Sequence, residues 1–185
     1  DISSLGDVEG VKAYDSPNLS EIKVSNGHSV LRDVQLIDCP LLKKLDLHDT
    51  GLLTLTVDSC PLTSLNVDQC IGLEQLSIKG TSLPKLNLST NKKLYSSRTK
   101  LGRQNIKTIR TYSYDEGMYY LTLLHEYISA IDKDRVSVSS TVGSYNAQTR
   151  IIKFNQKEGN GYYYDTRSPN SVGNLTVDID ASNFN

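Results

Sequence analysis

A repeated spacing of leucines between Leu31 and Asn91 restricts the possible folds of this chain more than any other feature. Six consecutive units place apolar residues at relative positions 0, 3 and 5 and a Cys, Thr or Asn at position 8, as Leu31, Val34, Leu36 and Cys39 do. Units of two kinds alternate, so one full turn has two arms and about 21 residues, and with looser upstream units there are about four turns. Because roughly three repeats bury a continuous core, the pattern predicts a leucine-rich-repeat solenoid.

Each arm has the pattern of a short β-strand. The apolar residues at positions 3 and 5 flank one outward residue, which is the alternation of a strand that buries one face. An arm has only about half of the 21-residue turn, and this length includes its strand, so it has no room for a real helix. We therefore predict a mainly β fold with two narrow stacks of parallel strands and little helix between them.

Position 8 of each unit is predicted to turn inward where its strand ends. A small polar side chain there can bond backbone groups of neighbouring turns and so form a ladder. This interpretation accounts for all three cysteines, and the close C-x₂-C pairs typical of zinc sites are absent. No disulfide is expected between Cys60 and Cys70, whereas Cys39 and Cys60, one turn apart, could be bridged geometrically but are expected to stay reduced. The predicted ladder comprises Cys39, Thr50, Cys60, Cys70, Thr81 and Asn91.

The composition changes after about residue 95, where the leucine period stops. Nine of the eleven tyrosines lie from Tyr112 onward, which indicates a second structural unit. Residues 105–114 and 118–124 have strand character around a turn at 115–117. We expect a solenoid over residues 1–96 and a small antiparallel β-sandwich-like domain over residues 97–185. The remaining strand candidates are residues 135–140, 150–155, 161–166 and 174–180.

One alternative within the second unit stays open. Residues 118–132 also carry apolar side chains at helical spacing, so the sequence does not decide between a strand and a helix there.

Two segments carry a resemblance to a known class of proteins. LTSLNVDQC at 62–70 and LPKLNLSTN at 83–91 resemble the internalin class of bacterial surface leucine-rich-repeat proteins, in the branch with a 21-residue repeat and frequent ladder cysteines. The resemblance covers roughly residues 8–96, although the ladder here mixes Cys, Thr and Asn. GSYNAQTRIIKF at 143–154 is similar to the immunoglobulin-like spacer that follows the repeats in such proteins. The resemblance implies a secreted or cell-surface bacterial protein that acts in protein–protein interaction or adhesion, with a structural spacer.

The outward positions of the solenoid are the candidate binding face, because they can vary without disturbing the core. They are polar and nearly without aromatics, whereas binding hot spots favour Trp, Tyr and Arg. The alternative is a glycan-binding protein that uses the Tyr-rich C-terminal module, including Tyr162–Tyr164. The candidate face comprises Gln35, Thr56 and Ser77 on one stack and Lys23, Asp46, Asn66 and Asn87 on the other.

Other classes of function are not favoured by the sequence. The formal net charge of -1 gives no general attraction to nucleic acid, and the basic run over residues 92–110 is interpreted as a solvated junction. No apolar run reaches the roughly 18 residues of a membrane span. His28, His48 and His125 lie in no recognisable catalytic motif, so we expect no enzyme, no metal and no cofactor. We also expect a monomer, and no signal peptide is visible, so any targeting or lipid-anchoring segment is expected to have been removed.

Overall fold

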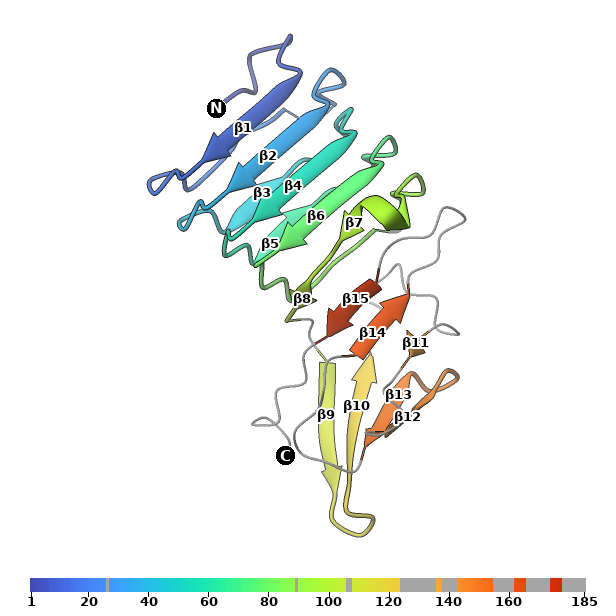
Figure 1. Ribbon diagram of the computed structural model, residues 1–185. Helices are drawn as coiled ribbons and strands as arrows, with labels where there is room; N and C mark the ends of the chain where they lie inside the picture. The colour runs from blue at the N-terminus through green and yellow to red at the C-terminus, as the bar shows by residue number, and fades with distance from the viewer. Residues whose placement is uncertain are drawn as a thin grey trace.

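The fold is described from a computed structural model, shown in Figure 1. The structure describes residues 1–25, 27–88, 90–105, 108–123, 136–137, 143–154, 162–165 and 174–177. Within these ranges the chain is built from strands, and a short 3₁₀ turn, η1 (Ser96–Arg98), is the only helical element. The prediction of a mainly β fold with little helix is thus confirmed.

The larger sheet of the solenoid contains five parallel strands. Its order is β1 (Gly10–Tyr14), β2 (Asp33–Ile37), β4 (Thr54–Asp58), β6 (Gln75–Lys79) and β7 (Thr99–Lys100), and Figure 1 shows these strands side by side. Equivalent positions of the repeat pair in register, so that Val34 pairs with Leu55 and Leu55 with Leu76. Alternating burial along β2 and β4 follows from the apolar residues at positions 3 and 5.

The second stack is narrower. Strands β3 (Lys44–Asp46) and β5 (Ser64–Asn66) form a two-stranded parallel sheet in which Leu45 pairs with Leu65. The two stacks together confirm the predicted solenoid of about four two-arm turns.

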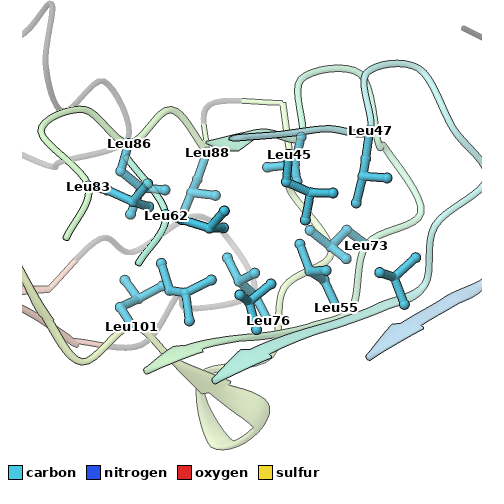
Figure 2. Close-up of a cluster of buried hydrophobic side chains, with 14 of the residues drawn as sticks. Leu45, Leu47, Leu55, Leu62, Leu73, Leu76, Leu83, Leu86, Leu88 and Leu101 are labelled. Atoms are coloured by element: carbon cyan, nitrogen blue, oxygen red, sulfur yellow. The ribbon is translucent and has the colours of Figure 1, made fainter. Parts of the chain in front are cut away.

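The core fills the space between the two sheets. In Figure 2, Leu45 and Leu47 from one arm face Leu55 and Leu76 from the other, and each of these side chains is at most 2% exposed. Leu73, at position 0 of its arm, lies between Leu47 and Leu55 and is fully buried. Burying one such side chain contributes about 1.5–3 kcal/mol to folding. The repeated leucines are therefore the main source of stability in this part of the chain.

The solenoid continues through one more arm than the leucine pattern indicated. The unit that starts at Leu94 loses the pattern at Ser97, because η1 inserts two residues before the strand. The pattern then resumes, since Thr99 pairs with Leu76, and Leu101 is 1% exposed. The solenoid sheet thus extends past residue 96, where the sequence placed the boundary.

The C-terminal part contains an antiparallel sheet ordered β12-β13-β10-β9. Its strands are β9 (Thr108–Ser113), β10 (Met118–Leu123), β12 (Gly143–Asn146) and β13 (Ile151–Phe154). The expected hairpin around residues 115–117 is present, with Gly117 at a positive φ of 63° in its turn. Strand β12 was not anticipated, because its sequence GSYN lacks the apolar alternation of a typical strand.

A second four-stranded sheet connects the solenoid to the C-terminal part. It is ordered β11 (Val136–Ser137), β14 (Tyr162–Asp165), β15 (Asn174–Val177) and β8 (Arg103–Gln104). The first three strands pair antiparallel, whereas β15 pairs parallel with β8. Sandwich-like packing and the immunoglobulin-like assignment stay predictions.

The helix alternative for residues 118–132 is decided only in part. Residues 118–123 form strand β10, as the strand interpretation predicted, and residues 124–132 lie outside the described part of the chain. No helix in the described ranges is long and apolar enough to cross a membrane.

The core packing predicts a large loss of stability from Leu55→Ala. Leu55 is 1% exposed in the centre of the larger sheet, so the truncation leaves a cavity and should lower the free energy of unfolding by about 2–5 kcal/mol in urea denaturation. Thr56→Ala, on the adjacent outward position, is the control and should cost less than about 1 kcal/mol. Equal losses for the two variants would contradict the assignment of inward and outward positions.

Candidate functional site

The outward face of the larger sheet carries three of the predicted binding residues in one row. Gln35 pairs with Thr56, and Thr56 pairs with Ser77, so the three side chains emerge side by side from β2, β4 and β6. All three are half-buried between core positions. The same row extends to Lys12 on β1 and Lys100 on β7.

A network of polar contacts organises the N-terminal end of this row. The Tyr14 hydroxyl donates to Gln35 Oε1 at 2.7 Å, and Gln35 Nε2 donates to Asp33 Oδ2 at 2.8 Å. Asp33 also accepts a hydrogen bond from Thr54 Oγ1 and lies 3.6 Å from Lys12 Nζ. The ion pair is solvent-exposed and adds at most about 1 kcal/mol, so its main effect is to fix the geometry. Tyr14, which is 48% exposed, is thereby held in one position on the sheet.

Tyr14 is a residue that the sequence analysis missed. The spacing from β1 to β2 is 23 residues rather than 21, as the pairing of Gly10 with Asp33 shows, and the upstream unit of Val8, Val11, Ala13 and Ser16 was predicted only as a weak one, so its outward residues were not among the candidates. The structure confirms that Val11 and Ala13 face the core, and this alternation leaves Lys12 and Tyr14 on the outward face.

A groove of about 410 Å³ adjoins the C-terminal ends of β1, β2 and β4. Asp15, Asp38 and Ser59 in its lining have positive φ values of 45°, 54° and 53°, and each ends its strand and precedes the residue that turns inward. Pro17 and Pro40 complete the lining, which is largely apolar. Tyr14 directly precedes Asp15, so the tyrosine adjoins the groove. We call this combined surface the N-terminal face. It consists of Lys12, Tyr14, Asp33 and Gln35 together with the groove residues Asp15, Pro17, Asp38, Pro40 and Ser59.

The other predicted set lies on the second stack. Asp46 and Asn66 pair in register, and Asp46 Oδ1 accepts a hydrogen bond from the His48 backbone at 3.1 Å. Asn66 and Asn87 both line a cleft of about 270 Å³. Lys23 is exposed and lies 3.4 Å from Glu21. The structure therefore brings Asn66 and Asn87 together, whereas Lys23 takes no part in the cleft.

The six residues expected in the ladder are all buried, between 0% and 6% exposed: Cys39, Thr50, Cys60, Cys70, Thr81 and Asn91. Thr50 Oγ1 and Cys70 Sγ, on successive turns, each donate to the Leu47 carbonyl at 2.9 Å. Asn91 Nδ2 donates to the carbonyls of Val67 at 2.9 Å and Cys70 at 3.1 Å. These side chains replace the water that backbone carbonyls would otherwise need at the buried strand ends.

Gln104 occupies the ladder position of the last arm and was not anticipated. Its Nε2 donates to the carbonyls of Ile78 at 3.0 Å and Leu101 at 2.6 Å. Its Oε1 accepts from Thr81 Oγ1 at 3.0 Å and from the Leu83 backbone at 2.9 Å. The two-residue insertion of η1 moved this glutamine out of the regular spacing, which is why the repeat pattern did not reveal it.

The three cysteines are free and buried. Burial raises the pKa of the Cys60 thiol from 9.0 to about 11, and a hydrogen bond with the Cys39 backbone, which lowers it, offsets this only in part. Burial likewise raises the pKa of Cys70. Both thiols stay protonated at neutral pH, and protonated thiols are poor nucleophiles and poor metal ligands.

The remaining candidate groups are the histidines of the sequence and the possible metal ligands in the described part of the chain. No three His, Cys, Asp or Glu side chains there are arranged to hold a metal ion. His28 is buried, with Nε2 2.9 Å from the Leu5 carbonyl, and His125 lies outside the described residues.

Comparison with known proteins identifies the fold. No protein-family model matches the chain, and no curated protein matches its sequence. Among solved structures, the chain is similar to the functional domain of InlJ from Listeria monocytogenes, which includes a cysteine ladder, with a TM-score of 0.53 and 19% sequence identity. The similarity covers 100% of this chain but 45% of that one, so the chain spans less than half the length of its structural neighbour. The predicted internalin-type fold is thus confirmed.

The position of Gln104 predicts a severe effect of Gln104→Leu. The leucine would fit the apolar surroundings but would leave the Leu83 N–H and the Ile78 carbonyl without this partner in the interior. We expect the free energy of unfolding to fall by at least about 2 kcal/mol in urea denaturation. Gln75→Leu, on an outward half-buried position of β6, is the control and should cost less than about 1 kcal/mol. A Gln104→Leu protein as stable as the control would show that the ladder bonds do not stabilise the solenoid.

The raised pKa of Cys60 predicts a loss of stability in alkali. The unfolded thiol ionises above pH 9.0, whereas the folded thiol keeps its proton up to about pH 11. The unfolded state therefore binds fewer protons in this window, and the free energy of unfolding falls as pH rises from 9.0 to about 11. Cys60→Thr, which places the ladder residue of the next turn at this position, should show a shallower decline in chemical denaturation series. Identical pH profiles for the two proteins would contradict the raised pKa.

Proposed function

We propose that this chain is a non-enzymatic binding module of a secreted or cell-surface bacterial protein, and that it binds a protein partner through the N-terminal face of the solenoid. The observation that carries the proposal is Tyr14, an exposed aromatic residue held in place by Gln35 beside a largely apolar groove.

The chemistry of the N-terminal face suits a protein interface. Tyrosine is enriched at binding hot spots because its ring supplies contact area and its hydroxyl a polar contact. The hydrogen bond to Gln35 fixes the ring before binding, so less conformational entropy is lost when a partner docks. Polar residues such as Lys12 and Asp33 surround the ring, which is the arrangement of an anchor within a polar rim.

The solenoid architecture also supports a binding role. Its outward residues can be exchanged while the leucine core is kept, so this kind of fold supplies an extended surface for recognition. The similarity of fold to InlJ and the internalin-like repeat are consistent with a module of a surface protein.

Glycan binding by the C-terminal module is the second candidate. Tyr112 lies 4.9 Å from Tyr114 and 4.6 Å from Tyr119 between ring centroids, and Tyr114 is 85% exposed at the hairpin turn. These rings form an aromatic cluster in which Tyr114 is exposed and the other two rings are half-buried, and a sugar ring could stack on the exposed ring. In the same hairpin, Lys153 Nζ donates a hydrogen bond to Glu116 at 2.6 Å, and this contact lowers the pKa of Glu116. Glu116 is therefore ionised, and its ion pair with Lys153 links the hairpin turn to β13. For Tyr162–Tyr164 the structure describes the backbone strand but not the side chains.

The proposal predicts a selective effect of Tyr14→Ala on binding to a protein partner. After identification of a partner by cross-linking to host-surface or neighbouring-cell proteins, its affinity is measured by biolayer interferometry. Tyr14→Ala should weaken binding by at least about tenfold, since hot-spot truncations cost more than 1–2 kcal/mol. Tyr95→Ala is the matched control, because Tyr95 is 45% exposed, close to the 48% of Tyr14, but lies at the opposite end of the sheet.

Two outcomes would contradict the proposal. Equal affinities of the two variants and the unaltered chain would exclude the N-terminal face as the binding surface. Partner binding that is lost in Tyr114→Ala and kept in Tyr14→Ala would move the interface to the C-terminal hairpin.

A further inference from the structure

The narrower stack of the solenoid opens after β5. Residues 85–87 lie one repeat beyond Ser64–Asn66 but form no strand, and only Leu86 makes an isolated bridge. The cleft of about 270 Å³ lies here and reaches the core at Leu65. Leu65 is accordingly only partly buried, whereas Leu45 and Leu86, at the same position of the neighbouring turns, are 2% and 3% exposed. The polar residues around this apolar floor are Thr63, Ser64, Asn66, Asp68, Lys85 and Asn87.

Two of the polar side chains are held rigidly by the turns around them. Asn66 Oδ1 accepts a hydrogen bond from the Asp68 backbone at 3.2 Å. Asp68 Oδ1 accepts from the Gln69 backbone at 3.0 Å and from Thr90 Oγ1 at 2.8 Å. Each side chain is thus positioned before any ligand arrives, which lowers the entropy that binding costs.

The same side chains keep polar atoms available. Among the residues that the structure describes, no hydrogen bond or ion pair engages Asn66 Nδ2, Asp68 Oδ2 or Lys85 Nζ. The cleft therefore offers an amide donor, a carboxylate acceptor and an ammonium donor around one apolar floor.

The chemistry of these groups selects a class of ligand. Asp68 and Lys85 carry opposite charges, so the cleft has no excess of either sign to favour a phosphate or a metal cation. No aromatic side chain lines it, which disfavours flat apolar ligands. A hydroxyl group both donates and accepts, so a ligand with several hydroxyls can satisfy the amide, the carboxylate and the ammonium together. The C–H face of a sugar ring would meet Leu65.

We propose that this cleft binds one unit of a neutral saccharide, with Asn66, Asp68 and Lys85 as its hydrogen-bonding residues. The site is separate from the N-terminal face, which lies on the other sheet, and from the tyrosine cluster of the C-terminal hairpin. It requires neither the proposed protein partner nor the C-terminal tyrosines.

The test uses the full chain and three neutral tetrasaccharides, built from glucose, N-acetylglucosamine or mannose. Saturation-transfer NMR at about 1 mM ligand detects weak binding of this kind, and titration calorimetry gives the affinity. At least one of the three should bind, and inorganic phosphate at the same concentration should not displace it.

Asn66→Asp is the decisive variant. It keeps an oxygen that accepts from the Asp68 backbone, replaces the Nδ2 donor with a carboxylate oxygen and adds one negative charge beside Asp68, so affinity should fall by at least about tenfold, the loss expected for one good hydrogen bond. The fold tolerates aspartate here, because Asp46 occupies the equivalent position one turn earlier with the same backbone contact. Asp46→Asn, the reverse change outside the cleft, is the matched control and should leave affinity unchanged. Lys85→Met, at an exposed position, should also weaken binding.

The outcomes separate this proposal from its competitors. Absence of binding by all three tetrasaccharides, or equal binding by Asn66→Asp and the unaltered chain, would overturn it. Displacement of the saccharide by phosphate would indicate an anion site instead. Binding that is lost in Tyr114→Ala but kept in Asn66→Asp and Lys85→Met would place saccharide recognition on the hairpin and exclude the cleft.

Discussion

At the end of every strand in the solenoid, the chain must turn while its backbone carbonyls still face a dry interior. A carbonyl buried without a hydrogen-bond donor costs about as much as a lost hydrogen bond, so a repeated turn is tolerated only if each repeat brings its own donor. The ladder supplies this donor, from the thiol of Cys70 and the hydroxyl of Thr50 through the amide of Asn91 to Gln104 at the end. The leucine stacks, the parallel register and the narrow arms all depend on turns that can be buried in this way.

The same turns decide where the binding surfaces lie. Residues with positive φ, such as Asp15 and Asp38, end each strand sharply and direct the next side chain inward, which leaves the groove of the N-terminal face beside them. On the narrower stack, Asn66 Oδ1 and Asp68 Oδ1 accept hydrogen bonds from the backbone of the turn, whereas Asn66 Nδ2 and Asp68 Oδ2 are directed to the proposed ligand of the cleft. The groove of the N-terminal face lies where these turns end the strands, whereas the cleft also depends on the missing strand at residues 85–87, which leaves Leu65 only partly buried.

How much the sequence revealed differs between the regular and the irregular turns. Where the period is 21 residues, the inward and outward positions followed from the pattern, as for Leu55 and Thr56. Where two residues are inserted before β7, the pattern lost its register and concealed Gln104, and the weak unit at β1 left Tyr14 outside the predicted candidates. An insertion that bulges out of a turn hardly changes the packing on either side, but it shifts every later residue in the count. The weak apolar alternation of the C-terminal strands explains why β12 was missed as well.

The sequence by itself determined the repeat, its two arms and the mainly β fold, because burying one face of a strand requires apolar residues at alternating positions and the chain repeats them at a constant spacing. It also supplied the six ladder residues of the regular units, since their position in the unit is fixed, but not Gln104. Only the tertiary structure decided which outward residues meet. The hydrogen bond from Tyr14 to Gln35 joins two turns, and the cleft near Asn66 exists because the next arm does not complete the sheet. Such contacts depend on the distances between turns and on local departures from the repeat, and a pattern of residue types along one chain does not contain these distances.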